Sequence, residues 1–329
     1  LRYLVSSMTE TLPALSQLPS PSTQRIALRI TAPAERALKQ GHPWIFDQSI
    51  IEQSHEGAPG DLAVIFDDKR SFLGVGLYDP TSPIRVRVLQ KIKPATIDTN
   101  WFHEKIKTAD AIRAPLKEQD TNGYRLIHGE NDGLPGLVID RYAETLVLKL
   151  YTPAWVPHLK DICTALQQTQ PCNHLILRLN RTLNKQVEYL HGLTDGMTLT
   201  PQTPESLLLF KENGLTFECD PINGQKTGFF LDQRENRERV RELSKDKSVL
   251  NVFSYTGGFS LYAADGGANE VVSVDFSTPA TQATIRNIQH NQNKPNVKNA
   301  KFETLDQDAF ESLAQMKASG RLFDIVILD

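Results

Sequence analysis

Apolar runs that alternate with helical stretches in residues 205–329 constrain the fold more than any other feature of this sequence. The runs SVLNVF, VVSVD and FDIVILD are short and almost continuous in apolar residues, which is typical of strands covered on both faces of a sheet. FSLYAAD, TPATQATIRNIQHN and DAFESLAQMKA have the composition of helices. This alternation predicts a parallel, doubly wound α/β sheet.

The rest of the chain predicts two further folded segments. Residues 25–92 contain the strand-like runs RIALRI, DLAVIFD, FLGVGLYD and IRVRVLQ, separated by glycine and proline, as in a small β-barrel or sandwich. Residues 93–204 combine a helical stretch with the hairpin-like LVIDRYAETLVLKL and the strand HLILRLN. We therefore predict a leader over 1–24, a β-barrel over 25–92, an α+β domain over 93–204 and the α/β domain over 205–329.

Composition narrows the class of protein. The first 24 residues lack the arrangement of a signal peptide, and their proline, serine and threonine content predicts a disordered leader. Met8 is a candidate for the true start. No stretch approaches the roughly 20 apolar residues that span a bilayer. The three cysteines, Cys163, Cys172 and Cys219, show no CxxC spacing, and we interpret them as reduced thiols of a cytoplasmic protein.

The turn within NVFSYTGGFS is the first candidate site. It follows a predicted strand, at the end of the sheet where doubly wound proteins bind ligands. Gly257 and Gly258 allow the backbone to approach a ligand closely, and Asp275 at the end of the next strand can accept hydrogen bonds from ribose hydroxyls. A strand-end turn is the alternative role of Asp275. These features alone leave NAD and S-adenosylmethionine open, although the absence of G-x-G-x-x-G disfavours NAD.

Other carboxylates have both local and ligand-binding interpretations. Asp308 in LDQDAF follows the next predicted strand and could accept a hydrogen bond from the exocyclic amine of adenine. It could equally cap the following helix, and the two roles are compatible; Asp306 is its rival. Asp232, with Glu235 three residues later, has the spacing of a capping box.

The block GQKTGFFLDQRENR, followed by VLNVFSYTGGFSLYA, VVSVD, DQDAF and FDIVILD, resembles the class I S-adenosylmethionine-dependent methyltransferases of large-subunit ribosomal RNA. It is most similar to the subfamily that makes 5-methylcytosine in 23S rRNA and carries an N-terminal PUA domain. GHPWIF resembles the entrance of that domain, and NGYRLIHGENDGLPGLVID the middle domain. The resemblance covers about residues 25–329. It implies a PUA-like β-barrel, a small α+β middle domain and a Rossmann-like class I methyltransferase domain.

The resemblance also implies a binding site for S-adenosylmethionine. It places the methionine portion on the turn, the ribose on Asp275 and adenine near Asp308, with Arg234 facing the cofactor carboxylate. Many members have an acidic residue where this chain has Asn251, whose amide oxygen can still accept a hydrogen bond. The implied cofactor-binding residues are Phe253, Ser254, Tyr255, Thr256, Gly257, Gly258, Asp275, Asp308, Gln233 and Arg234.

The expected partner is 23S rRNA, with neither a metal nor a membrane involved and a homodimer left open. The net charge of −3 excludes a simple polycation but leaves a local RNA-binding patch open. Arg85 and Arg87 share one face of a predicted strand, which could contact phosphate or be merely solvated. Trp44 is interpreted as a core residue rather than a base-stacking platform. The candidate RNA-binding residues are Arg25, Arg29, Arg36, Lys39, Arg85 and Arg87.

The end of the sequence raises a further expectation. In the family, the strand FDIVILD leads into a D-P-P-x-F loop that holds the substrate base, and Asp329 would begin it. We therefore expect a truncated methyltransferase domain whose last strand is an unpaired hydrophobic edge. Methylation of cytosine C5 needs a cysteine nucleophile, and none of the three cysteines suits that role. We expect the nucleophile beyond residue 329, and this chain to bind cofactor without methylating RNA.

Two other functions remain open from the sequence. One is a noncatalytic RNA-binding protein that keeps a decayed cofactor fold. The other is an NAD-dependent oxidoreductase, which Asp275 tolerates. Within the main hypothesis, the sequence leaves the target nucleotide open, since a guanine could face the same cofactor domain.

Overall fold

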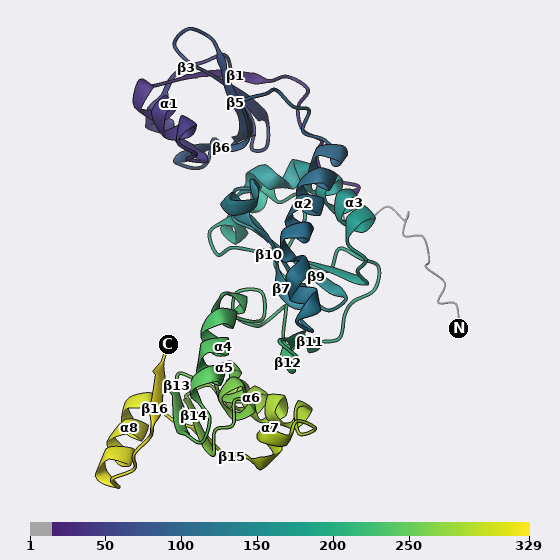
Figure 1. Cartoon of the computed structure of the whole chain (residues 1–329). Coiled ribbons are helices and arrows are strands. Elements are labelled where there is room, and N and C mark those ends of the chain that lie inside the picture. Colours follow the sequence, from purple (N-terminus) through teal and green to yellow (C-terminus); the bar gives the residue numbers. More distant parts are fainter. Residues whose placement is uncertain (1–14) are drawn as a thin grey trace. The chain divides into compact units, whose positions relative to one another are not determined.

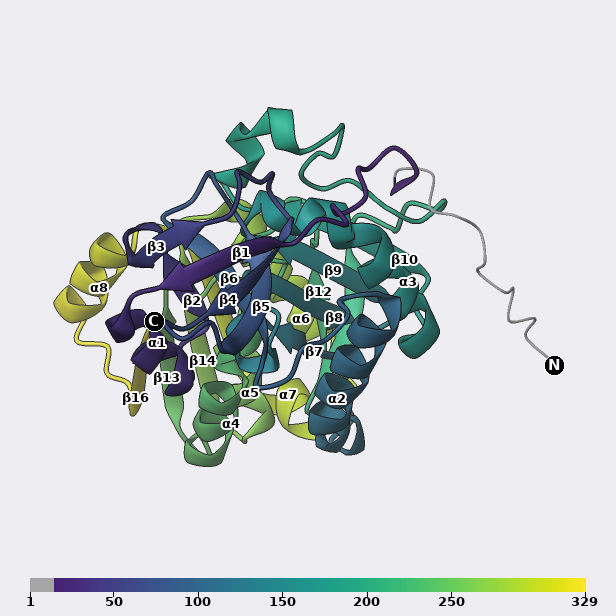
Figure 2. The same ribbon diagram turned by 90° about the horizontal axis from the view of Figure 1, so that it is seen from above.

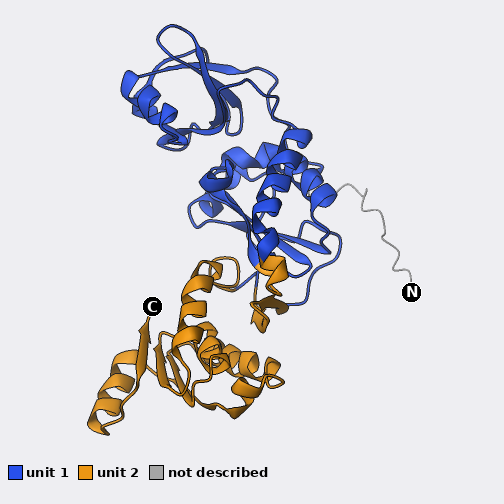
Figure 3. Cartoon of the chain, viewed as in Figure 1, with its two compact units in different colours: residues 1–115, 124–206, 221–223 blue, residues 116–123, 207–220, 224–329 orange. Residues whose placement is uncertain are grey.

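A computed structural model describes residues 15–329 (Figure 1). Most of the predicted leader, residues 1–24, and Met8 lie outside the described residues. The chain divides into two compact units, each built from non-consecutive segments (Figure 3). Unit 1 comprises the chain up to residue 115 with residues 124–206 and 221–223; unit 2 comprises residues 116–123, 207–220 and 224–329. The four domain limits given above stay predictions.

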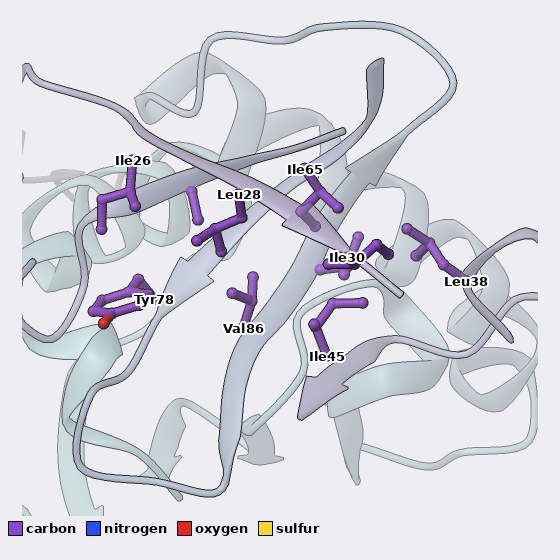
Figure 4. Close-up of a cluster of buried hydrophobic side chains, with 10 residues drawn as sticks. Ile26, Leu28, Ile30, Leu38, Ile45, Ile65, Tyr78 and Val86 are labelled. Atoms are coloured by element: carbon purple, nitrogen blue, oxygen red, sulfur yellow. The ribbon is translucent and has the colours of Figure 1, made fainter. Parts of the chain in front are cut away.

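Unit 1 begins with a six-stranded sheet in the order β2-β6-β5-β4-β1-β3. Ile26, Leu28 and Ile30 alternate along the first strand and are buried, as the two-residue period of a strand requires. They meet Ile45 and Val86 from other strands in one apolar cluster (Figure 4), so the sheet curls around its own core. The predicted barrel-like fold is confirmed. Its elements are β1 (Ile26–Ile30), α1 (Ala32–Lys39), β2 (Trp44–Phe46), β3 (Ile50–Gln53), β4 (Leu62–Phe66), β5 (Phe72–Tyr78) and β6 (Ile84–Lys91).

The second part of unit 1 contains a four-stranded sheet in the order β10-β9-β8-β7. Strands β8 (Leu137–Tyr142) and β9 (Thr145–Leu150) are antiparallel, which confirms the predicted hairpin. Helices α2 (Thr99–Glu118) and α3 (Leu159–Thr169) lie next to each other (Figures 1 and 2), and Thr99 donates a hydrogen bond of 2.6 Å to Asp161 between them. The remaining strands are β7 (Gly123–His128) and β10 (His174–Leu179).

Buried polar contacts join these two parts of unit 1. His158, at the end of the 3₁₀ helix η4 (Pro153–His158), has no exposed surface. Its Nε2 donates to the carbonyl of Gly60 at 2.8 Å, and its Nδ1 has no partner in the described part of the chain. Gly60 has a φ of +95°, which favours glycine. Thr152 donates a second buried hydrogen bond, of 2.6 Å, to Asp79.

Unit 2 contains a parallel sheet in the order β15-β14-β13-β16, which confirms the predicted doubly wound α/β fold. The chain passes from β13 to β14 and β15 on one side, and then to β16 on the other side of β13, so the strand order reverses at β13. Val326 and Leu328 on the edge strand are 52% and 65% exposed. The elements are α4 (Arg234–Leu243), β13 (Ser248–Val252), α5 (Gly258–Asp265), β14 (Glu270–Asp275), α6 (Thr278–His290), α7 (Pro295–Asn299), β15 (Lys301–Asp306), α8 (Ala309–Ala318) and β16 (Ile325–Leu328).

An antiparallel hairpin precedes this sheet. It pairs β11 (Leu208–Glu212), which the sequence did not reveal, with β12 (Leu215–Cys219). Strand β11 reads LLFKE, and its two charged residues obscure the strand pattern. Glu212 has no exposed surface, because Arg237 from α4 pairs with it at 2.7 Å. A partner 25 residues away in sequence is what allows a carboxylate in this position.

The predicted capping box at Asp232 is wrong. Helix α4 begins at Arg234 after the 3₁₀ helix η7 (Leu231–Gln233), and its N-cap, Gln233, makes no side-chain capping bond. The Asp232 carboxylate instead pairs with Lys226 at 2.9 Å. Asp232 thus makes an ion pair with Lys226 and does not cap α4.

Unit 1 should lose stability in mild acid through His158. Burial lowers the pKa of His158 below its ordinary value of about 6.5, so the unfolded chain takes up a proton that the native chain does not. The histidine's stabilising contribution is complete above about pH 6.5 and is lost as the pH falls through the native pKa. His158→Gln keeps a donor for Gly60 and does not titrate. Urea unfolding at about pH 7.5 and about pH 5.5 should show a smaller loss for the variant; an equal loss in both proteins would contradict this role.

Candidate cofactor-binding site

A cavity of about 520 Å³ lies at the carboxyl ends of β13, β14 and β16 in unit 2. This is where the strand order reverses, the position at which doubly wound sheets bind ligands. The volume is in the range of small-molecule sites. The cavity is lined by Gln225, Lys226, Phe229, Phe230, Gln233, Arg237, Phe253, Ser254, Tyr255, Thr256, Gly258, Phe259, Asp275, Phe276, Ser277 and Asp329.

The structure brings most of the predicted cofactor-binding residues together at this cavity. Three of the ten do not line it. Gly257 is the N-cap of α5, Arg234 hydrogen bonds to Glu235, and Asp308 is the N-cap of α8. The seven that line the cavity are Phe253, Ser254, Tyr255, Thr256, Gly258, Asp275 and Gln233.

The turn over residues 253–258 has an unusual backbone. Phe253 and Tyr255 have φ angles of +59° and +47°, and Gly257 has +75°. Left-handed conformations cost non-glycine residues about 1 kcal/mol or more each and persist only where surrounding contacts enforce them. Glycine is required at 257 for a further reason, since a Cβ there would lie 2.5 Å from the side chain of Thr284. The contacts that enforce this turn therefore define the site.

Asp275 provides one of these contacts. Its Oδ2 accepts a hydrogen bond from the backbone N–H of Tyr255 at 2.8 Å, and its Oδ1 accepts one from Ser277 at 2.9 Å. Backbone N–H groups that follow β13 and β14 therefore orient the carboxylate before any ligand binds. Each carboxylate oxygen can accept a second hydrogen bond. The turn-forming role and a ribose-binding role are compatible.

Helix α6 holds the other side of the turn. Thr284 donates to the carbonyl of Tyr255 at 3.1 Å, and Asn287 donates to the carbonyl of Thr256 at 2.9 Å. The Asn287 side chain also accepts a hydrogen bond of 2.8 Å from the N–H of Glu218 in β12. One buried amide thus joins the hairpin to the turn. Sequence reasoning missed it, although the 284, 287 and 291 spacing places three polar side chains on one face of a helix.

Residues 224–233 form the opposite wall of the cavity. The rings of Phe230 and Tyr255 meet edge to face, with centroids 5.2 Å apart. Arg237, also missed, donates to the carbonyl of Phe230 at 3.0 Å and makes a bidentate ion pair with Glu212 at 2.7 and 2.8 Å. Because Glu212 neutralises it, Arg237 positions this wall and is not a free cation for a ligand.

Two buried hydroxyls in the cavity have no partner among residues 15–329. Ser254 Oγ and Thr256 Oγ1 make no hydrogen bond, although their residues are only 6% and 9% exposed. Leaving such groups unpaired costs free energy, so the cavity suits a ligand with several polar groups. Phe276, directly after Asp275, is 77% exposed and offers an aromatic face.

Neither Asn251 nor Asp308 lines the cavity, although the resemblance implied a contact with the cofactor at both positions. Asn251 is 1% exposed and donates to Ser260 Oγ at 2.9 Å within a buried polar group, so it does not line the cavity. The capping alternative for Asp308 is confirmed, because its Oδ1 accepts hydrogen bonds from the N–H groups of Phe310 and Glu311 at 2.8 and 3.1 Å.

The six candidate RNA-binding residues all lie in unit 1, and they differ in exposure. Arg87 is 7% exposed and pairs with Asp79 at 3.3 Å. The prediction that it contacts RNA is corrected, since its guanidinium stabilises the interior. Arg85 donates to the carbonyl of Pro80 at 2.7 Å, and Arg29 pairs with Glu52 at 3.2 Å. Arg25, Arg36 and Lys39 are exposed.

The three cysteines do not line the cavity. Cys163 and Cys219 are buried, and burial raises the pKa of the Cys163 and Cys172 thiols. Within residues 15–329, no group of three or more His, Cys, Asp or Glu could hold a metal ion. In the same residues, no helix has both the length and the apolar character needed to cross a membrane.

Comparison with known families accounts for both parts of the chain. Residues 125–329 match the model of the S-adenosylmethionine-dependent methyltransferases, and residues 28–91 match a PUA-like domain. Because the first match covers more than half of the chain, the protein belongs to the S-adenosylmethionine-dependent methyltransferase family. The predicted family and cofactor are thereby confirmed.

Two relatives named as ribosomal RNA methyltransferases are similar over most of their length. The "ribosomal RNA large subunit methyltransferase" of Deinococcus radiodurans is 46% identical over 316 residues, covering 94% of this chain and 76% of the relative. The "ribosomal RNA large subunit methyltransferase I" of Aliivibrio fischeri strain MJ11 is 38% identical, covering 92% and 75%.

Solved structures share the fold. A putative methyltransferase from Streptococcus mutans superposes with a TM-score of 0.77 at 22% identity, covering 92% of this chain and 76% of that one. A putative methyltransferase complexed with SAH gives 0.76 at 20% identity, covering 93% and 75%.

Asn287→Ala should weaken cofactor binding by releasing the Thr256 carbonyl and thus the strained turn. We expect affinity for S-adenosylhomocysteine, measured by calorimetry, to fall about tenfold, since a lost buried hydrogen bond costs roughly 1–3 kcal/mol. Asn291→Ala is the matched control. Asn291 is the C-cap of α6; its side chain binds the backbone of Thr216 on β12, at 2.9 and 2.7 Å, and the carbonyl of Asn287, at 2.8 Å, and makes no contact with the turn in the described residues.

The two variants should be destabilised to a similar extent, and only Asn287→Ala should lose affinity. Equal losses of affinity in both would show that α6 acts through general stability and would contradict a positioning role for Asn287.

Proposed function

We propose that this protein methylates large-subunit ribosomal RNA, with S-adenosylmethionine bound in the 520 Å³ cavity of unit 2. The observation that carries the proposal is the cavity itself: Asp275 and two unpartnered hydroxyls line it, at the strand-order reversal of a chain in this family. The substrate class is supported by the names of relatives that are 46% and 38% identical.

The residues that line the cavity fit the parts of the cofactor. Asp275 accepts the ribose hydroxyls, and the exposed ring of Phe276 packs on adenine. The methionine portion lies along residues 253–258, where the hydroxyls of Ser254 and Thr256 gain partners. Gln233 contributes from the opposite wall. Two of the implied residues lie outside the cavity lining: Asp308 has only its Oδ2 available for the adenine amine, since Oδ1 caps α8, and Arg234 would have to leave Glu235 to reach the cofactor carboxylate.

The chemistry needs orientation more than proton transfer. When bound, S-adenosylmethionine supplies an electrophilic methyl group. The chain's own residues hold this group in place through the turn and screen it from water with the aromatic side chains of Phe230 and Tyr255. Such positioning is a large part of catalysis when two reactants must meet in line.

Cytosine C5 in 23S rRNA is the proposed target atom. Attack there requires a thiolate that first adds to C6 of the base. The structure favours none of the three cysteines for this role, because burial raises the pKa of the Cys163 and Cys172 thiols and Cys219 is buried outside the cavity lining. Exposed cations on the β-barrel part, Arg25, Arg36 and Lys39, are candidates for phosphate contacts. Because the proposed substrate is ribosomal RNA, we propose that the protein acts in the cytoplasm.

Asp275→Asn should weaken binding of S-adenosylhomocysteine by tenfold or more. The amide can accept at only one atom, so it loses a charged hydrogen bond worth about 1.5–3 kcal/mol. Asp306→Asn is the matched control, because Asp306 pairs in register with Asp275 on the neighbouring strand and is exposed. Calorimetry on both variants tests the assignment. Equal affinity of Asp275→Asn and the unaltered protein would contradict it, and tighter binding of NAD than of S-adenosylhomocysteine would favour an oxidoreductase.

Deleting the gene for this protein from its host should remove one 5-methylcytosine from 23S rRNA. Mass spectrometry of nuclease digests measures the loss, and 16S rRNA is the control. Loss of a methyl group from another base would retain the methyltransferase and refute the cytosine assignment. Unchanged methylation of 23S rRNA would refute the proposed function and favour a noncatalytic RNA-binding role.

A further inference from the structure

Unit 1 contains a second cavity, of about 570 Å³, which the proposed function does not use. It lies between one face of α2 and the 3₁₀ turn η3 (Gly129–Asp132). We call it the α2 pocket. It is lined by Gln90, Trp101, Glu104, Lys105, Thr108, Ala109, Ile112, Glu130, Asn131, Asp132 and Gly133.

Lys105 is the distinctive residue of the α2 pocket. It is half-buried, its Nζ lies 5.1 Å from the centroid of the Trp101 ring, and a Cβ built on Gly133 would be 3.1 Å from that nitrogen. No carboxylate of the described residues pairs with it. Burial lowers the pKa of Lys105, and no neighbouring charge counteracts this effect. The ammonium group therefore lacks the anionic partner that a partly desolvated cation needs.

The acidic residues of the pocket have other partners. Asp132 makes a bidentate ion pair with Arg113, with both contacts at 2.7 Å. Glu130 accepts a hydrogen bond of 3.1 Å from the indole N–H of Trp44, and Glu104 contacts His103 at 3.2 Å. Glu104 and Glu130 are exposed, where water screens them. The charge left without a partner is that of Lys105.

The rest of the wall is apolar along α2 and polar on the turn. Trp101, Ala109 and Ile112 follow the helical period on one face, and Ile112 is 65% exposed. Asn131 adds an amide from η3. An uncompensated ammonium beside an aromatic and aliphatic surface matches a nucleotide, with its phosphate on the cation and its sugar and base on the apolar wall.

We propose that the α2 pocket binds one nucleotide of the RNA substrate, with a phosphate on Lys105 and the nucleoside against Ile112 and the edge of Trp101. The site is distinct from the cofactor cavity, since all its residues belong to unit 1, and none of them was among the candidate RNA-binding residues. This inference rests on the proposed rRNA substrate.

Binding of deproteinised 23S rRNA to the full chain tests the site. Lys105→Met removes the charge and keeps an unbranched stem over Trp101; Lys107→Met makes the same change at an exposed position on α2. We expect Lys105→Met to bind about tenfold more weakly, the effect of one charged hydrogen bond. Its slope of log affinity against log salt should fall by about one. Lys107→Met should differ little from the unaltered protein, and thermal unfolding should be similar for all three.

A second pair of variants tests the nucleoside wall. Ile112→Glu replaces the apolar contact proposed for the nucleoside with a carboxylate, while Ala114→Glu adds the same charge at another exposed position of α2. Only Ile112→Glu should weaken binding of 23S rRNA.

Equal effects within both pairs would overturn the α2 pocket and leave the proposed function standing. If the unaltered protein shows no measurable binding to RNA, and so no preference for 23S rRNA over 16S rRNA, the proposed function and the α2 pocket fail together.

Discussion

The cofactor site depends on how the 253–258 turn is held. Phe253 and Tyr255 adopt left-handed conformations that a free chain would leave. Asp275 fixes the turn through a backbone N–H, and Asn287 fixes it through a backbone carbonyl. The restraints come from β14 and α6, so the shape of the ligand cavity is a property of the whole α/β unit. Because the turn is already ordered, less of the binding free energy is lost to ordering the site when a ligand binds.

The sequence predicted those parts of the structure that depend on local pattern. Continuous apolar runs and intervening helices gave the parallel sheet, and paired glycines with a following aspartate gave the turn. It failed where function depends on a partner distant in sequence. The resemblance implied Arg234 as the cation that faces the cofactor carboxylate, but the arginine that α4 turns toward the cavity wall is Arg237, which pairs with Glu212. The sequence pattern did not single out Asn287, because its role depends on contacts with β12 and with the turn that only the folded chain brings together.

In unit 1, the environment of charged side chains likewise depends on residues that are distant in sequence. Arg85 and Arg87 share a strand face in sequence, and a solvated or RNA-facing surface followed from that pattern. The structure buries Arg87 against Asp79, because the second part of the unit covers that face and Thr152 completes the polar group. Conversely, Lys105 looks like an ordinary helix residue in the sequence, and in the structure the Trp101 ring and the turn at Gly133 lie close to its ammonium group.

The β11–β12 hairpin supports both walls of the cofactor cavity. Glu212 at the end of β11 pairs with Arg237, which holds the carbonyl of Phe230 in one wall. The N–H of Glu218 in β12 binds Asn287, which holds the carbonyl of Thr256 in the other wall. The width of the cavity therefore depends on a two-stranded element that does not itself line it.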